Sequence, residues 1–268
     1  MARSLSFPAA ALVLGVSMQS CTSGITHADS AFAGAATSDS RAEGRYVEIE
    51  NERFHFVYSY PSEAVEFPAV RVFLDQDLSA SQTQLVQQAS EAKADADKEG
   101  YPHRPHYLAV GWDVAADLSG WLSLRAEVET YAGGAHGNHG FTSLLFDKKA
   151  NTKREPISLF LSNDAFVSAI RTPFCNALNV ERGERRGKAL SPDSWSSDDS
   201  FEACIDPEDG VVLLDSEDGE AFDRITILVA PYLAGPYAEG SYEIAVPVTA
   251  AIRSAVLPEF RDAFAVHH

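Results

Sequence analysis

Two alternating segments around one short turn constrain the fold of this chain most. From Leu108 to Val114 and again from Leu122 to Tyr131, apolar and polar residues alternate with a period of two. Successive side chains of a strand point to opposite faces, so this period is typical of strands buried on one side. Asp117 to Gly120 supplies turn residues between them. The sequence therefore predicts a β-hairpin over residues 108–131.

Other strands are expected on both sides of this hairpin. Alternating aromatic residues from Phe54 to Tyr60 indicate an earlier strand that ends at Pro61. Two later alternating segments, 225–229 and 242–246, flank a turn at 235–240 and predict a second pair.

Helices are expected where a polar residue able to cap the first turn precedes apolar residues at helical spacing. The first would begin at Ser79 or Ser81 and end near Lys98, before Gly100. The other two are expected over 163–178, with a kink or break at Pro173, and from about 249 to 256. The segment 181–209 is polar and is interpreted as an irregular excursion.

The order of these elements favours an α+β fold: antiparallel sheets with a few packed helices. Strands that pair with sequence neighbours, and helices that do not alternate strictly with them, are typical of this class. We expect two small subdomains that share one body, residues 45–148 and residues 149–268.

The N-terminus has the pattern of an export signal. Arg3 precedes an uncharged apolar segment, 7–18, too short to span a bilayer, and Cys21 follows Ser20. This arrangement resembles a bacterial lipoprotein processing site, so residues 1–20 are interpreted as a signal peptide and Cys21 as a lipidation site. Cleavage after Ala33 is the alternative. Residues 21–44 are small and polar and are expected to form a flexible tether.

Two further cysteines, Cys175 and Cys204, form an even pair in a chain expected to be exported. Such a pair indicates a disulfide. Closing a loop of this length contributes about 3.5 kcal/mol by the chain-entropy estimate. Two buried free thiols are the alternative.

The charge of the chain limits its partners. With 21 Lys and Arg against 39 Asp and Glu, the formal net charge is −18, and it becomes −19 once Arg3 leaves with the signal peptide. Nucleic-acid binding requires basic patches, so we expect no nucleic-acid partner. An acidic surface favours soluble behaviour and attracts basic partners.

A glycine-rich stretch, Glu129 to Gly140, is the most distinctive motif. It holds four glycines around His136 and His139, directly after a predicted strand. Paired histidines can bind zinc, and a second pair with the same spacing lies at 103 and 106. Neither pair is expected on a helix and no further ligand pattern accompanies them, so we expect no metal and no cofactor. The alternative reading of His136 is a hydrogen bond within its own turn.

Catalytic signatures are absent from the sequence. It has no nucleophile elbow, no His-Glu-x-x-His motif, no P-loop and no dinucleotide fingerprint. The acidic segments 206–210 and 215–219 lack the ligand alternation of an EF-hand loop and are interpreted as acidic turns. No catalytic residue is assigned, although paired glycosidase carboxylates meet in space and leave no sequence pattern.

Two stretches together resemble a known family. Tyr131–Asn138 resembles the Tyr-x-Gly-Gly-Ala-His-x-Asn signature, and Pro231–Gly240 resembles the Pro-Tyr stretch, of the domain pair of unknown function in RsiV and PdaC. RsiV is a lysozyme-sensing anti-sigma factor, and PdaC is a peptidoglycan deacetylase with a separate catalytic domain. The resemblance implies the fold, a place in the cell envelope and a binding role. It does not extend to the sigma-binding segment or to the deacetylase domain.

These observations lead to one expected function. We expect a membrane-anchored lipoprotein, facing the periplasm or cell surface, that binds a basic lysozyme-like protein or peptidoglycan without catalysis. The alternatives are an enzyme or accessory domain acting on peptidoglycan, for example a deacetylase-associated one, and an assembly component without a soluble ligand. The candidate binding residues lie in the two motifs: Tyr131, Gly133, Gly134, His136, Asn138, His139, Tyr232 and Tyr237.

Overall fold

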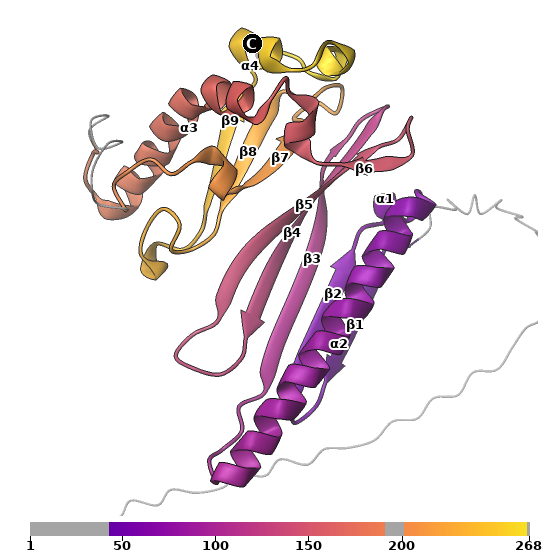
Figure 1. The fold of residues 1–268 in the computed structure, drawn as a ribbon, viewed down its shortest axis with the longest axis vertical. Helices are drawn as coiled ribbons and strands as arrows, with labels where there is room; N and C mark the ends of the chain where they lie inside the picture. The colour runs from indigo at the N-terminus through magenta and orange to yellow at the C-terminus, as the bar shows by residue number, and fades with distance from the viewer. Residues whose placement is uncertain (1–42, 191–200, 267–268) are drawn as a thin grey trace, which may run out of the picture. The chain divides into compact units, whose positions relative to one another are not determined.

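A computed structural model of the chain describes residues 43–190 and 201–266. The described residues do not include the predicted signal peptide, most of the predicted tether or the predicted lipidation site Cys21. In the described part, the strands form two sheets (Figure 1). The first has the order β1 (Arg45–Glu50), β2 (Phe54–Tyr60), β3 (His106–Asp117), β4 (Trp121–Tyr131), β5 (Asn138–Asp147) and β6 (Thr152–Arg154). The second has the order β7 (Val211–Asp215), β8 (Arg224–Val229) and β9 (Tyr242–Pro247).

Four α-helices and several 3₁₀ turns complete the described part of the chain. The helices are α1 (Ser62–Val65), α2 (Pro68–Glu99), α3 (Asn163–Arg186) and α4 (Ala250–Ala255). The 3₁₀ turns are η1 (Pro156–Leu159), η3 (Pro207–Asp209), η4 (Tyr237–Glu239) and η5 (Pro258–Ala263). The predicted α+β class is confirmed.

The hairpin predicted over residues 108–131 is confirmed as β3 and β4. Val110 pairs with Val128 in antiparallel register, and a bulge lies between Val114 and Ala116. The late pair is likewise confirmed as β8 and β9. The expectation of antiparallel pairing fails at one place, because β2 pairs with β3 in parallel. A crossover through α2 returns the chain to the same end of the sheet, which parallel pairing requires.

Helix α2 begins at Pro68, well before the predicted caps Ser79 and Ser81. Proline is favoured in the first turn of a helix, where its missing N–H has no partner to lose. The helix runs beside β2 and β3 in Figure 1. Its buried residues keep one face toward the sheet along most of its length: Val70, Leu74, Leu78, Leu85, Ala89 and Ala96. It ends at Gly100, as predicted, with φ of +76°.

Helix α3 contains Pro173 and is a single helix, so the predicted break is wrong. Ser162 caps it, because its side chain accepts a hydrogen bond from the Ala165 N–H at 3.0 Å. Ile170 and Phe174, on either side of the proline, are both fully buried. Tertiary packing on both sides of Pro173 thus offsets the hydrogen bond lost there, since most helix stability in proteins comes from such packing.

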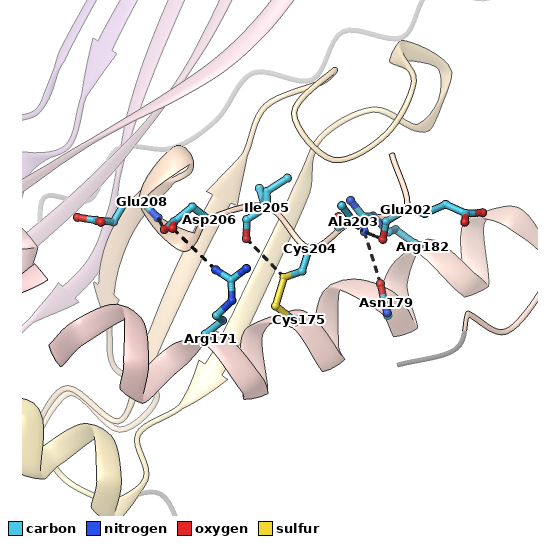
Figure 2. The surroundings of a disulfide bond; sticks show 10 residues. All are labelled: Arg171, Cys175, Asn179, Arg182, Glu202, Ala203, Cys204, Ile205, Asp206 and Glu208. Carbon is cyan, nitrogen blue, oxygen red and sulfur yellow. Dashed lines mark hydrogen bonds and ion pairs between the residues drawn. A yellow bond between two sulfur atoms is a disulfide. The ribbon is translucent and has the colours of Figure 1, made fainter. Parts of the chain in front are cut away.

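The predicted disulfide between Cys175 and Cys204 is confirmed. It joins the middle of α3 to the segment that leads into η3 and β7, and its Cα atoms lie 5.6 Å apart (Figure 2). The excursion predicted from residue 181 starts later, because α3 continues to Arg186. Figure 2 also shows Arg182, two helix turns further on, whose guanidinium donates to the carbonyl oxygen of Ala203 at 3.0 Å.

Two apolar clusters form the interior of the described residues. One lies between α2 and β2–β5, and the other among α3, α4 and β7–β9. Trp121 and Leu145 belong to the first sheet but are part of the second cluster. The two sheets are also tied directly, since the Ser143 hydroxyl on β5 donates to the Val212 carbonyl on β7 at 3.0 Å. Among the described helices, none is both long and apolar enough to cross a bilayer.

Candidate functional site

The two sequence motifs meet in space although they lie about 100 residues apart. The turn between β4 and β5 carries His136, and the loop between β8 and β9 carries Tyr232 and Tyr237. The rings of His136 and Tyr237 stack with centroids 3.9 Å apart and an interplanar angle of 24°. The centroid of Tyr232 lies 5.5 Å from that of Tyr237. We call these three residues the loop cluster.

One carbonyl oxygen fixes the loop cluster. The Gly137 oxygen accepts from the Tyr237 hydroxyl at 2.8 Å and lies 2.7 Å from His136 Nδ1. A carbonyl can only accept, so Nδ1 carries a proton and donates to the Gly137 oxygen. The Tyr232 hydroxyl lies 3.4 Å from Nε2 of the same ring. His136 is therefore held within its turn, as the alternative reading of the sequence proposed.

Glycines shape the turn that presents His136. Gly133 and Gly134 have φ of +86° and +100°, conformations that residues with a Cβ rarely adopt. A Cβ at Gly137 would lie 2.8 Å from the Thr130 carbonyl oxygen, too close for any side chain without a shift of the strand end. The motif is glycine-rich because the backbone turns sharply and then returns close to β4.

Arg104 and Tyr131 also hold the turn that carries His136. The Arg104 guanidinium donates to the Gly134 carbonyl at 2.8 Å and to the Tyr131 hydroxyl at 3.3 Å. The Tyr131 hydroxyl in turn donates to the Gly134 carbonyl at 3.2 Å. Tyr131 is thus a structural part of the turn and is not in the stack of rings.

Helix α3 positions the second loop through three arginines. Arg182 is fully buried and donates to the Ala234 carbonyl at 2.8 Å. Arg185 donates to the carbonyl oxygens of Glu239 and Ser241 at 2.5 and 2.7 Å. Arg186 forms an ion pair with the Glu239 carboxylate at 2.8 Å. These contacts hold the middle and the C-terminal end of the loop that carries Tyr232 and Tyr237.

The ion pair between Arg186 and Glu239 lies mostly inside the protein. Both side chains are only 14% exposed, and the Tyr242 hydroxyl also donates to Glu239. The hydrogen bond from Arg186 lowers the pKa of Glu239 and raises that of Arg186. Burial, together with the hydrogen bond to Glu239, raises the pKa of Tyr242 to about 12. Glu239 is therefore ionised and held in place behind the loop cluster.

Tyr232 is the exposed residue of the loop cluster. Its side chain is 53% exposed, and the neighbouring Leu233 is 40% exposed. The backbone of Tyr232 has φ of +71°, which is rare for a bulky residue and costs about 1–3 kcal/mol. The fold thus holds a large aromatic side chain outward in a strained conformation.

The other candidate residues have different positions. Asn138 begins β5 and pairs with Thr130 in the sheet. His139 packs on Phe141 with centroids 5.0 Å apart, and its Nε2 is buried without a hydrogen-bond partner in the described residues. Arg104 and the Arg186–Glu239 pair were missed by the sequence analysis. Their roles come from contacts between residues far apart in the sequence, which a short sequence pattern does not reveal.

The side-chain contacts of His136 and of the second histidine pair show which groups lie near each imidazole. In the described residues, His136 is held by a carbonyl oxygen and a tyrosine hydroxyl, without a carboxylate that would strengthen it as a base. The rings of His103 and His106, the second pair, stack with centroids 6.1 Å apart. In the part of the chain that the structure describes, no group of three or more His, Cys, Asp or Glu side chains is placed to hold a metal ion.

Comparisons with known proteins agree with this fold. Residues 47–139 match the family described as Deacetylase PdaC. The crystal structure of a DUF3298 family protein from Pseudomonas aeruginosa PAO1 superposes with a TM-score of 0.50 at 15% identity, over 84% of this chain and 96% of that one. A DUF3298 family member from Bacteroides fragilis NCTC 9343 gives a TM-score of 0.49 at 14% identity, over 76% and 90%. The search of curated proteins gives no match.

Proposed function

We propose that this chain, in which a PdaC-type domain over residues 47–139 is part of a DUF3298-like fold, is a non-catalytic binding module of the cell envelope. The observation that carries the proposal is the contact between the two motifs. His136 stacks on Tyr237 at 3.9 Å, and Tyr232 projects beside them. A strained backbone and a buried ion pair hold an exposed aromatic group. The strain at Tyr232 costs free energy, and a surface that binds no partner would gain nothing in return.

A basic wall-active protein of the lysozyme kind is the leading partner. Aromatic residues are enriched in protein interfaces and provide much of their binding energy. Tyr232 and Leu233 supply an exposed aromatic and apolar anchor. The net charge of −18 would speed the approach of a basic protein and add more to the association rate than to affinity.

Peptidoglycan is the second candidate ligand, and the stacking geometry favours it. The exposed ring of Tyr232, beside the stacked pair of His136 and Tyr237, offers a flat aromatic surface on which a sugar ring could pack. Both ligands occur in the envelope, and both would use the same three residues.

The proposed location is the outer side of a membrane, with a lipid at Cys21. The disulfide between Cys175 and Cys204 supports export, because such bonds form and persist in oxidising compartments. The lipid anchor rests on the sequence pattern around Cys21 alone.

The test compares two tyrosine variants of the full chain. We expect calorimetry to detect binding of lysozyme, or pull-down to detect binding to purified peptidoglycan, and Tyr232→Ala to weaken it about tenfold or more. Tyr46→Ala is the matched control, because Tyr46 on β1 is also highly exposed, at 64%, and is not in the loop cluster.

Two results would contradict the proposal. One is that neither ligand binds at any accessible concentration. The other is that Tyr46→Ala and Tyr232→Ala weaken binding equally. Turnover of muropeptides that is lost in His136→Ala, with folding retained, would instead establish the enzymatic alternative.

A further inference from the structure

The outer edge of β9 is open in the described part of the chain. β9 pairs with β8 along its whole length, and no described strand pairs with its other side (Figure 1). The opposite edge of this sheet, β7, lies against the first sheet, where the Val212 carbonyl accepts from Ser143. β9 is therefore the edge of the second sheet that another strand could still join.

The register of β8 and β9 shows which backbone groups face this open edge. The Val248 N–H donates to the Asp223 carbonyl at 2.7 Å, directly after the last paired residues of the two strands. In an antiparallel ladder every second residue bonds the partner strand, so the residues between them turn their N–H and C=O groups outward. Counted back from Val248, the outward residues are Glu243, Ala245 and Pro247.

Pro247 agrees with this assignment. Proline has no N–H, and within sheets it is confined mainly to edge strands, where the missing donor faces away from the ladder. In the described residues, the outward N–H and C=O groups of Glu243 and Ala245 have no hydrogen-bond partner, and both residues are exposed. The edge thus offers a row of free donors and acceptors at the spacing of a strand.

A charged hollow lies beside the open edge. Its volume is about 420 Å³, and Glu243 and Ala245 line it together with the end of β3. Arg125 is already paired with Glu243 at 2.6 Å, and Arg224 lies 3.5 to 3.8 Å from three carboxylates. Asp113, which also lines the hollow, has no ion pair among the described residues. The hollow therefore has more carboxylates than arginines, and we call it the acidic hollow.

The two faces of β9 suit different side chains. Successive side chains of a strand point to opposite faces, and residues opposite each other on neighbouring strands share a face. Side chains of an added strand opposite Glu243 and Ala245 would thus point to the side of the acidic hollow. Those opposite Tyr242 and Ile244, which are buried and packed with α3, would lie beside the apolar core.

We propose that the open edge of β9 binds, as an added strand, an extended segment of another protein in which basic and apolar residues alternate. In strand addition the backbone bonds provide affinity, and alternate side chains provide specificity. Basic side chains match the acidic hollow and the net charge of −18. Glu243 and Pro247 are residue types with which proteins prevent an edge from pairing with a copy of itself. This site shares no residue with the loop cluster and does not depend on the function proposed for it.

The test uses the full chain and a capped octapeptide in which Lys and Val alternate. We expect calorimetry to give a dissociation constant of about 1 mM or tighter, in the range of weak specific binding. Two further peptides carry N-methyl groups, one on all its Lys amides and the other on all its Val amides. An antiparallel added strand turns its Lys amides toward β9, and a parallel one its Val amides. The two methylated peptides should therefore differ in affinity by about tenfold or more.

A pair of charge variants tests the acidic hollow. Glu243→Lys should weaken binding of the octapeptide about tenfold, because it places a positive charge beside the Lys side chains. Glu48→Lys is the matched control, since Glu48 is also exposed, lies on β1 and gives the same change in net charge. The Glu243–Arg125 pair is largely exposed, so its loss should leave the fold intact.

Hydrogen exchange locates the bound peptide. In the free protein the amides of Glu243 and Ala245 are not bonded, and saturating octapeptide should slow their exchange about tenfold or more. The Ile244 amide faces β8 and should change little.

Four results would overturn the inference. The first is the absence of binding by the unmethylated octapeptide. The second is equal affinity of the two methylated peptides. The third is equal weakening by Glu243→Lys and Glu48→Lys. The fourth is slowed exchange in β1 in place of β9, which would move the peptide to the edge of the first sheet.

The oligomeric state tests the identity of the occupant. We expect analytical ultracentrifugation to show that the chain without peptide does not associate through this edge. A dimer in which the Glu243 and Ala245 amides are already slow to exchange would make a second copy the occupant and overturn the proposal of a foreign segment.

Discussion

At the residue scale, Glu239 links helix α3 to the loop between β8 and β9, which carries Tyr232 and Tyr237. Its carboxylate accepts from Arg186 and from Tyr242, and the helix also bonds its backbone through Arg185. Because the Arg186–Glu239 pair is mostly buried, removing one charge leaves the other without compensation. The Arg186–Glu239 pair is therefore, in the described residues, the one mostly buried ion pair among the contacts that hold the loop carrying Tyr232 and Tyr237.

We predict that Glu239→Gln lowers the free energy of unfolding at pH 7 by about 3 kcal/mol, measured by urea unfolding. The hydrogen bond from Arg186 lowers the pKa of Glu239 below its ordinary 4.5 in the folded state. The stability it provides is thus fully present above pH 4.5 and is lost as the pH falls through the lower folded-state pKa. The difference between wild type and variant should therefore shrink below pH 4.5.

The control for this prediction is Glu243→Gln. Glu243 pairs with Arg125 at 2.6 Å, but its side chain is 43% exposed, so we expect a loss of at most about 1 kcal/mol. Equal losses in the two variants at pH 7, or a Glu239→Gln loss that does not change with pH, would contradict the assigned role of Glu239.

The sequence analysis named the three residues of the loop cluster as candidates, but it did not name the residues that support them. His136, Tyr232 and Tyr237 lie in motifs with unusual local composition, and the structure brings them together. Arg186 lies in the last turn of the amphipathic helix α3, and Glu239 lies in the Pro231–Gly240 stretch but was not among the candidate residues. Their importance comes from a contact between residues 53 positions apart, which no local pattern encodes.

At the scale of elements, α3 depends on its covalent link to the segment before β7. Cys175 is fully buried, Cys204 is 7% exposed, and they are 29 residues apart in sequence. The link limits the freedom of the unfolded chain. It involves α3, the helix that carries the three arginines in contact with the loop between β8 and β9.

We predict that the Cys175→Ala/Cys204→Ala double variant loses about 3.5 kcal/mol of stability in urea unfolding. Wild-type protein treated with a reductant should lose a similar amount, whereas the double variant should not respond to the reductant. If the reductant destabilises both proteins equally, the disulfide is not the cause of the loss.

The sequence predicted the strands whose residues alternate strictly, and it missed β1, β5, β6 and β7. A period of two is a strong local signal where one face is buried, and the strands over 54–60, 108–131, 225–229 and 242–246 are confirmed. The start of α2 was missed because Pro68 was not interpreted as a first-turn residue. The parallel pairing of β2 with β3 was missed because it depends on where α2 returns the chain.

At the scale of the whole described body, the two apolar clusters share the first sheet. Trp121 packs against Phe222 and Phe260 with centroids 6.1 and 5.8 Å apart, although the two phenylalanines come late in the chain. The first sheet also extends to Arg154, past residue 148. The division into residues 45–148 and 149–268 stays a prediction, and these contacts make it testable.

We predict that residues 45–148 expressed alone do not form a well-packed domain. Without the later residues, Trp121, Leu145 and their neighbours would expose apolar surface that is buried in the chain. The fragment should bind a hydrophobic dye and unfold without a cooperative transition, whereas residues 45–268 should unfold in one step. A fragment with a dispersed NMR spectrum and cooperative unfolding would show that the two parts fold independently.

The bridge between α3 and the segment before β7 also matters for how long such a protein lasts outside the cytoplasm. If a protease cuts any one peptide bond between Cys175 and Cys204, the sulfur–sulfur bond still joins the two pieces. The nicked molecule would run as an intact chain on a gel without reductant and as two fragments with it. A cut in this segment would therefore leave the molecule in one piece until the disulfide is reduced.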